Sequence, residues 1–95
     1  MDENRARQLR RAVALRYDRA RGVAPTVAAT GSGYVADRII EIAREHGVPI
    51  REDPDLVQLL AKLDLEQTIP PELYAVVAEV FAFVYRLNTE HGRAV

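Results

Sequence analysis

Hydrophobic and polar positions change their spacing along the chain, and the first two apolar runs have the length of strands. Ala12–Tyr17 is a short, mostly apolar segment that follows the arginine-rich N-terminus, and Thr26–Thr30 is a second one. Both are short runs of strand-forming residues, and the segment between them contains Gly22 and Pro25 as breakers. The connection is short enough to predict an antiparallel pair. Residues 2–10 predict a weak helix, since only Ala6 and Leu9 are apolar there.

Three later stretches have apolar residues at helical spacing. Tyr34 to His46 presents a wide apolar stripe, and Gly47 is the expected C-terminal stop. Asp53-Pro54 predicts a second helix, because an aspartate cap precedes a proline at the first helical position. Pro70-Pro71 predicts the start of the longest helix, which extends to about Leu87 and carries a broad apolar face.

Two short segments complete the predicted order. Val48-Pro49-Ile50 is too short for a helix and predicts a strand, and Asp64 to Ile69 has room for one short edge strand. The order is then helix, strand, strand, helix, strand, helix, helix. We therefore expect an α+β (α/β-like) fold, in which helices flank both faces of a small mixed sheet of three to four strands.

The composition excludes several classes of protein but does not indicate an activity. The chain has 95 residues, 48% hydrophobic and 28% charged, which predicts one folded domain with a modest core. It contains no cysteine, which excludes disulfides and thiolate metal ligands. No apolar run reaches the roughly 18 residues that span a bilayer, and the N-terminus lacks the apolar core of a secretory signal. We expect a cytoplasmic protein.

The net charge of −1 conceals an asymmetry. The first 21 residues hold seven arginines against Asp2, Glu3 and Asp18, so this segment carries about +4 and the remainder about −5. Such an arm can bind nucleic acid or an anionic surface, and this is our alternative function. The simpler interpretation is a solvated helix and a strand with outward arginines. No aromatic residue precedes Tyr17 among these arginines, which weakens a base-stacking role.

The candidate catalytic and metal-binding patterns are incomplete. Gly31-Ser32-Gly33 precedes a helix as phosphate-binding turns do, but neither the P-loop nor the G-x-G-x-x-G pattern is present. The acidic cluster Glu52, Asp53 and Asp55 is explained by helix capping. His46 and His91 lack partners at ligand spacing, and with Ser32, the sole serine, they do not form a plausible triad. We expect no enzyme activity, no cofactor and no metal.

Taken together, the chain resembles the cytoplasmic C-terminal domain of the FlhB family, the substrate-specificity switch proteins of flagellar and related type III export systems. The similarity runs in register through about residues 11 to 88, which leaves residues 1–10 as a basic helix or arm and residues 89–95 as a frayed tail. The stretches that carry it are Ala12 to Asp18, Ala24 to Val27, Gly31 with Tyr34 to Ala36, Arg38 to Ile50, Ile69 to Tyr74, Val77 to Val80, and Val84-Tyr85.

The chain departs from the family at its best-known motif. Family members carry Asn-Pro-Thr-His one residue before the strand that corresponds to Ala12–Tyr17, and the asparagine cyclises and breaks the chain there. The corresponding positions are occupied by Arg7, Gln8, Leu9 and Arg10. Asn4 and Asn88 precede Arg5 and Thr89, so no Asn-Pro exists anywhere. The asparagine nucleophile is missing, and self-cleavage is predicted to be absent. Full-length members carry a membrane domain ahead of this module, and this sequence contains no transmembrane helix. We therefore expect a standalone counterpart of the cleaved C-terminal fragment, with a truncated form as the alternative.

The resemblance also implies a binding site and partners. In the family an apolar pocket recognises exported subunits, and the corresponding positions are Ala24, Pro25, Ala78 and Phe81. A plain core role for Ala78 and Phe81 is equally compatible with the sequence. The implied partners are export-gate proteins of the FlhA and FlhB type and exported flagellar subunits, with no nucleic acid. The implied location is the cytoplasm, at the inner face of the membrane export apparatus.

Overall fold

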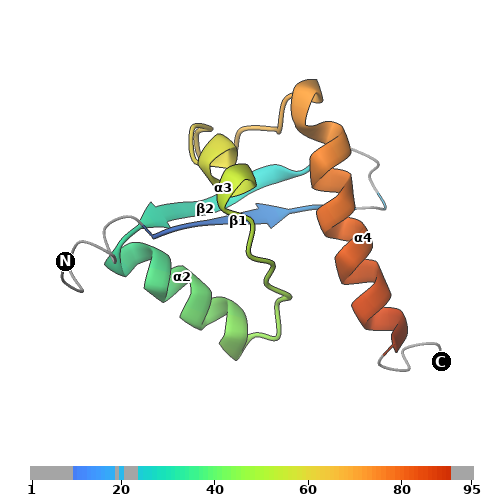
Figure 1. Cartoon of the computed structure of the whole chain (residues 1–95), viewed down its shortest axis with the longest axis horizontal. Helices are drawn as coiled ribbons and strands as arrows, with labels where there is room; N and C mark the ends of the chain where they lie inside the picture. The colour runs from blue at the N-terminus through green and yellow to red at the C-terminus, as the bar shows by residue number, and fades with distance from the viewer. Residues whose placement is uncertain (1–9, 19, 21–23, 91–95) are drawn as a thin grey trace.

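A computed structural model describes residues 10–18, 20 and 24–90, with side chains described up to residue 84. Two strands form an antiparallel pair, α2 lies against one face of it, and α3 lies on the opposite face (Figure 1). The predicted α+β class with helices on both faces is confirmed. The elements in chain order are β1 (Arg11–Arg16), β2 (Thr26–Ser32), α2 (Tyr34–Glu45), α3 (Pro54–Leu60), the 3₁₀ turn η1 (Pro71–Leu73) and α4 (Tyr74–Glu90).

The sheet has two strands in the described part of the chain, rather than the predicted three to four. Its register changes where Ala14 pairs with Ala29 but Leu15 pairs with Val27, which makes Ala28 the extra residue of a β-bulge. Bulges increase the local twist and bend the bulged strand, so β2 is bent at this point.

The predicted strand at Val48-Pro49-Ile50 does not form. The Val48 N–H donates to the carbonyl of Ala43 at 2.8 Å as part of the helix end, and Pro49 has no N–H. Only Ile50 retains a backbone N–H that could pair with a neighbouring strand. The segment therefore has too few free backbone donors to join the sheet.

The segment 66–69 runs along the outer edge of β2 without becoming a full strand. The Val27 N–H donates to the Gln67 carbonyl at 3.0 Å, and the Glu66 N–H donates to the Val27 carbonyl at 2.8 Å. A single bridge between Thr26 and Thr68 results. Glu66 has a positive φ of 66°, which ends the extended run on its N-terminal side.

Local signals set the helix ends as predicted. The carboxylate of Asp53 accepts a hydrogen bond from the Leu56 N–H at 3.0 Å at the start of α3. At the end of α2, Gly47 adopts φ 69°, its N–H donates to the Arg44 carbonyl at 3.2 Å, and the Val48 N–H reaches back to Ala43. This is a Schellman motif, which requires the left-handed conformation that glycine adopts without strain. The last helix begins with the 3₁₀ turn and continues to Glu90, beyond the predicted end near Leu87.

The core lies between β1, α3 and α4. Four buried side chains form its centre, and half-buried apolar residues of β1, α4 and the connections pack around them; the centre comprises Leu56, Leu60, Ile69 and Val77. Val13 and Leu15 of β1 contact this cluster. On the other face of the sheet, Ala12 of β1 and Ala36 of α2 are buried. Among the described residues, no helix combines the length and apolar character needed to cross a membrane. The helix predicted for residues 2–10 lies outside the described residues except for Arg10, which is not helical.

Candidate protein-binding site

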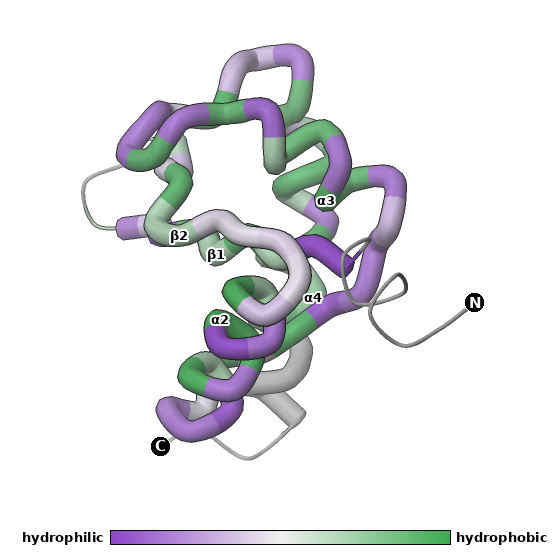
Figure 2. The backbone as a smooth tube through the Cα atoms, turned by 90° about the vertical axis from the view of Figure 1, so that its left-hand side faces the viewer, coloured by the Kyte–Doolittle hydropathy of each residue, from purple (hydrophilic) through white to green (hydrophobic). Residues whose placement is uncertain are grey.

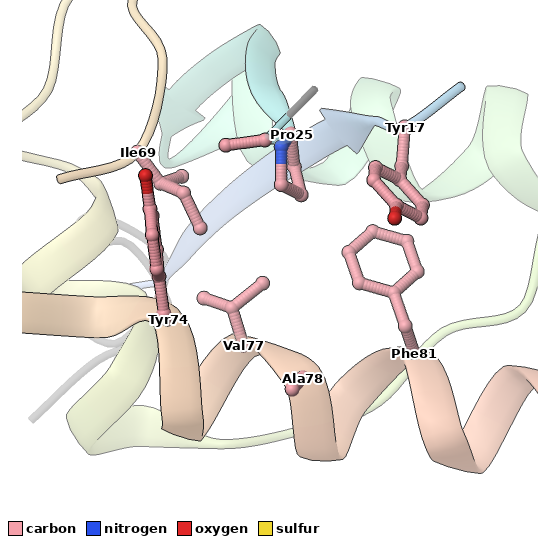
Figure 3. Close-up of a pocket in the computed structure, with 8 residues that line it drawn as sticks. Tyr17, Pro25, Ile69, Tyr74, Val77, Ala78 and Phe81 are labelled. Atoms are coloured by element: carbon pink, nitrogen blue, oxygen red, sulfur yellow. The ribbon is translucent and has the colours of Figure 1, made fainter. Parts of the chain in front are cut away.

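An apolar pocket of about 380 Å³ opens between α4, the end of the β1–β2 connection and the segment that precedes η1. It is lined by small, branched and aromatic side chains from four separate parts of the chain: Tyr17, Ala24, Pro25, Ile69, Tyr74, Val77, Ala78 and Phe81. Figure 3 shows Pro25 and Ile69 on one side and the α4 residues on the other.

The floor of the pocket is buried. Ile69 and Val77 are 2% and 1% exposed and belong to the core cluster, and Pro25 is also buried. The Ile69 N–H donates to the Pro25 carbonyl at 3.0 Å, which fixes the segment before η1 to the segment before β2. A buried backbone hydrogen bond between two core-anchored residues holds this floor in one arrangement.

Aromatic side chains form the two ends. The rings of Tyr17 and Phe81 have centroids 5.1 Å apart and are tilted by 45°, a geometry within the favourable range for aromatic pairs. Tyr74 lies at the opposite end and is half exposed (Figure 3). Between them lies Ala78, exposed and small, so the surface is hollowed there.

Helical geometry explains why one helix supplies half of the lining. Tyr74, Val77, Ala78 and Phe81 follow the spacing i, i+3, i+4 and i+7, which places them on one face of α4. This spacing was available in the sequence and could have added Tyr74 and Val77 to the predicted site. Tyr17 had no comparable signal, because the end of a strand does not reveal which helix it meets.

The structure brings the four predicted site residues together. Ala24, Pro25, Ala78 and Phe81 all line the pocket, although more than 50 positions separate the two pairs in the sequence. Ala78 is exposed and Phe81 is half-buried against the core, so Phe81 serves both the packing and the lining. Their role in binding stays a prediction.

The chemistry of the pocket suits an apolar ligand. Its only titratable lining groups are the tyrosine hydroxyls of Tyr17 and Tyr74. The ion pair of Arg16 with Glu66 at 3.3 Å lies outside this lining, is exposed and joins β1 to the segment beside β2. No buried polar side-chain atom in the described part of the chain lacks a partner. The pocket therefore offers shape and apolar surface.

The other sequence candidates occupy structural positions. Asp53 caps α3, and the His46 ring Nδ1 lies 3.0 Å from the carbonyl oxygen of Ile42 in the last turn of α2. Ser32 is exposed at the end of β2 and makes no capping hydrogen bond to α2. Within the described residues, no group of three or more His, Asp or Glu side chains gathers at metal-binding distance. His91 lies outside the described residues.

Of the four residues that replace the cleavage motif, only Arg10 lies within the described part. Its guanidinium pairs with the carboxylate of Asp37, and its carbonyl accepts a hydrogen bond from the Gly33 N–H at 2.9 Å. Arg16 is also paired with a carboxylate. These two arginines are partly neutralised, which gives the nucleic-acid alternative no specific support.

Comparison with known proteins shows which family the chain belongs to. The model of the FlhB HrpN YscU SpaS Family matches residues 9–84. The chain belongs to this family. It is 51% identical over 80 residues to the uncharacterized protein YlqH of Bacillus subtilis, across 84% of this chain and 86% of that protein. It is 48% identical over 77 residues to the flagellar biosynthetic protein FlhB of Salmonella typhimurium, across 80% of this chain but 20% of FlhB. The match thus spans about one fifth of the FlhB protein.

Solved structures of family members share the fold. The crystal structure of the PscU C-terminal domain superposes with a TM-score of 0.74 at 29% identity, over 79% of this chain and 96% of that one. The cytoplasmic domain of FlhB from Shewanella putrefaciens also gives a TM-score of 0.74, at 40% identity, over 81% of this chain and 65% of that one. The chain is therefore an FlhB-type C-terminal domain of the kind found in flagellar and type III export systems.

Proposed function

We propose that this protein acts in flagellar or type III protein export as a non-enzymatic binding module. Its pocket would bind an apolar segment of an exported subunit or of an export-gate protein of the FlhA or FlhB type. It would do so in the cytoplasm, at the inner face of the export apparatus. The observation that supports this most is the convergence of Ala24, Pro25, Ala78 and Phe81 on one apolar pocket.

The size of the pocket sets the scale of the ligand. A volume of about 380 Å³ falls at the lower end of the range for ligand sites, so it accommodates two or three apolar side chains of a peptide and not a folded surface. The exposed aromatic edges of Tyr17 and Tyr74 supply the anchoring surface that is enriched at protein interfaces. Binding should therefore depend on a short apolar motif in the partner.

A charge placed in the pocket tests this function. Ala78→Asp puts a carboxylate among apolar side chains, where desolvation without a partner is unfavourable, and should weaken binding to exported subunits about tenfold or more. Ala78 is exposed, so the fold should be retained. Isothermal titration calorimetry with purified hook or rod subunits measures the affinity.

Ala82→Asp is the matched control, because Ala82 is exposed on α4 one turn further along and does not line the pocket. It should bind as the unaltered protein does. If both variants lost the same affinity, any new charge on α4 would weaken binding, and the pocket would not be the binding site. If the unaltered protein bound no subunit and no gate protein, the proposed function itself would be wrong.

The absence of self-cleavage is part of the proposal. Cleavage in the family needs an asparagine side-chain amide before proline, and Arg7, Gln8, Leu9 and Arg10 provide neither. The intact mass should remain unchanged after several days at 37 °C, while a family member with Asn-Pro-Thr-His, incubated in parallel, should fragment. A fragment ending within residues 7–10 would contradict this expectation.

A further inference from the structure

α2 carries apolar side chains that the strand pair does not cover. It is the only helix on its face of the sheet in the part of the chain that the structure describes (Figure 1). Ala36 of α2 is fully buried, whereas Val35 is 56% exposed and Ile42 is 40% exposed. Two strands lie about 5 Å apart and a helix with its side chains is about 10–12 Å wide, so the sheet is too narrow to bury both flanks of α2.

Helical spacing joins the exposed residues of one flank into a stripe. We call this the α2 stripe; it consists of Val35, Arg38, Ile42 and Glu45. All four are exposed, and they follow the spacing i, i+3, i+7 and i+10 that contact positions of paired helices have. Figure 2 shows hydrophobic and hydrophilic residues interspersed along α2. The stripe therefore combines two apolar side chains with two opposite charges.

The described chain begins on the other flank of α2. The Arg10 guanidinium pairs with the carboxylate of Asp37. Asp37 follows Val35 by two positions, which turns it by about 200° around the helix axis. Arg10 is thus held away from the α2 stripe. This attachment favours a second molecule, rather than the chain's own residues 1–9, as the occupant of the stripe.

The charges of the stripe select a second copy of this chain. Arg38 lies four positions before Ile42 and Glu45 lies three positions after it, so a two-fold axis between residues 41 and 42 sets each Arg38 opposite Glu45 of the other copy. The same axis sets Val35 opposite Val48, which follows the helix and is 52% exposed. A parallel arrangement would set like charges opposite each other, which is unfavourable. The stripe is therefore complementary to itself in the antiparallel arrangement.

The existing ion pair of Arg38 does not prevent this contact. Arg38 donates to the Glu41 carboxylate at 2.9 Å on the same helix, and both side chains are 60% exposed. A guanidinium has five N–H groups, so Arg38 can keep this bond and donate to Glu45 of a second copy. Exposed ion pairs add little stability, so the charges set the orientation while Val35 and Ile42 supply the apolar contact.

We propose that two copies of this chain pair through their α2 stripes in antiparallel orientation. Ile42 packs on Ile42 of the second copy at the two-fold axis, and each Arg38 meets Glu45 of the other copy. None of the stripe residues lines the pocket, so the pairing leaves both pockets open. The pair therefore presents two pockets, and its formation does not depend on what the pocket binds.

Sedimentation equilibrium of the full chain tests the pairing. A contact between two helices of 12 residues is small beside the roughly 1,200–2,000 Å² of stable interfaces, so we expect a weak dimer with a Kd of about 100 µM. The average mass should rise from monomer toward dimer between about 10 µM and about 1 mM protein. Ile42→Ser, which removes the central apolar contact, should weaken the dimer about tenfold or more.

Charge exchange tests which residues meet. Arg38→Glu and Glu45→Arg should each weaken the dimer about fivefold or more, because each sets like charges opposite each other. The double variant Arg38→Glu/Glu45→Arg should restore the affinity to within about twofold of the unaltered protein. Arg44→Glu makes the same change of net charge as Arg38→Glu at an exposed position outside the stripe, and it should leave the dimer unaffected.

Disulfide cross-linking tests the orientation, and the chain has no cysteine of its own. Ile42→Cys places a thiol beside the two-fold axis and should give a covalent dimer on mild oxidation. Val35→Cys should not, because antiparallel pairing separates the two copies of this position by about 20 Å along the helices, beyond the reach of a disulfide.

Several results would overturn the proposal. A full chain that stays monomeric at about 1 mM would remove the dimer, and pairing that appears only after deletion of residues 2–9 would mean that the chain covers its own stripe. A dimer that Ile42→Ser leaves intact, or that the folded double charge variant fails to restore, would place the contact elsewhere. Cross-linking of Val35→Cys as fast as Ile42→Cys would exclude the antiparallel register.

Discussion

Gly31 of β2 lies directly beneath the first turn of α2. A Cβ atom at this position would stand 2.9 Å from Cβ of Val35 and also meet its Cγ1 atom, and it would lie 3.4 Å from Cδ1 of Ile39. The backbone of Gly31 has no positive φ, so close approach is the reason for glycine here. A single missing methyl group allows α2 to pack closely on the sheet.

We expect Gly31→Ala to lower the free energy of unfolding by about 1–3 kcal/mol, because the added methyl group overpacks the contact with α2. Urea denaturation followed by circular dichroism measures this. Combining Gly31→Ala with Val35→Ala should recover part of the loss, since the clashing side chain is removed. Ser32→Ala, at the exposed next position, should change stability by less than about 0.5 kcal/mol. Additive effects of Gly31→Ala and Val35→Ala would exclude the contact as the cause.

At the scale of elements, local chemistry defined the helices more reliably than the strands. Both ends of α2 and the start of α3 depend on nearby residues such as Gly47 and Asp53, so the sequence predicted them closely. The end of α3, at Leu60, had no such signal. The strand predicted at Val48-Pro49-Ile50 depended on a partner for its backbone. That partner is absent from the described chain, and the helix end uses the Val48 N–H instead.

Removing the cap of α3 should have a measurable cost. Asp53→Ala deletes the acceptor for the Leu56 N–H and should lower the free energy of unfolding by about 1 kcal/mol. Asp55→Ala removes a neighbouring carboxylate of the same first turn, which does not cap the helix, and should cost only a few tenths of a kcal/mol through the helix dipole. Thermal unfolding by calorimetry compares the two variants. Equal losses would show that charge near the helix start matters and the cap does not.

At the scale of the whole molecule, the pocket and the core share their residues. Ile69 is 2% exposed, belongs to the central cluster, hydrogen-bonds Pro25 through its backbone and lines the pocket. Val77 likewise serves both. The pocket is therefore continuous with the core, which holds its floor in place.

This sharing predicts that Ile69→Ala affects stability and binding together. The free energy of unfolding should fall by about 2–4 kcal/mol because a cavity replaces a buried side chain. Affinity for subunits should fall as well, because the floor of the pocket is lost. Leu65→Ala, at a 58% exposed position, should leave both unchanged. If folded Ile69→Ala protein bound subunits with normal affinity, binding would not depend on this core residue.

The sequence by itself determined the described helices, the cap of α3 and the antiparallel pair, because these features depend on residue spacing and on neighbours within a few positions of the chain. The two halves of the pocket were implied only by the resemblance to the family. The tertiary structure decided the number of strands and the full lining of the pocket. Strand pairing and pocket closure need contacts such as Tyr17 with Phe81 and Ile69 with Pro25, between segments more than 40 positions apart. No local pattern encodes which of these segments meet, because that choice depends on how the helices pack over the sheet as a whole.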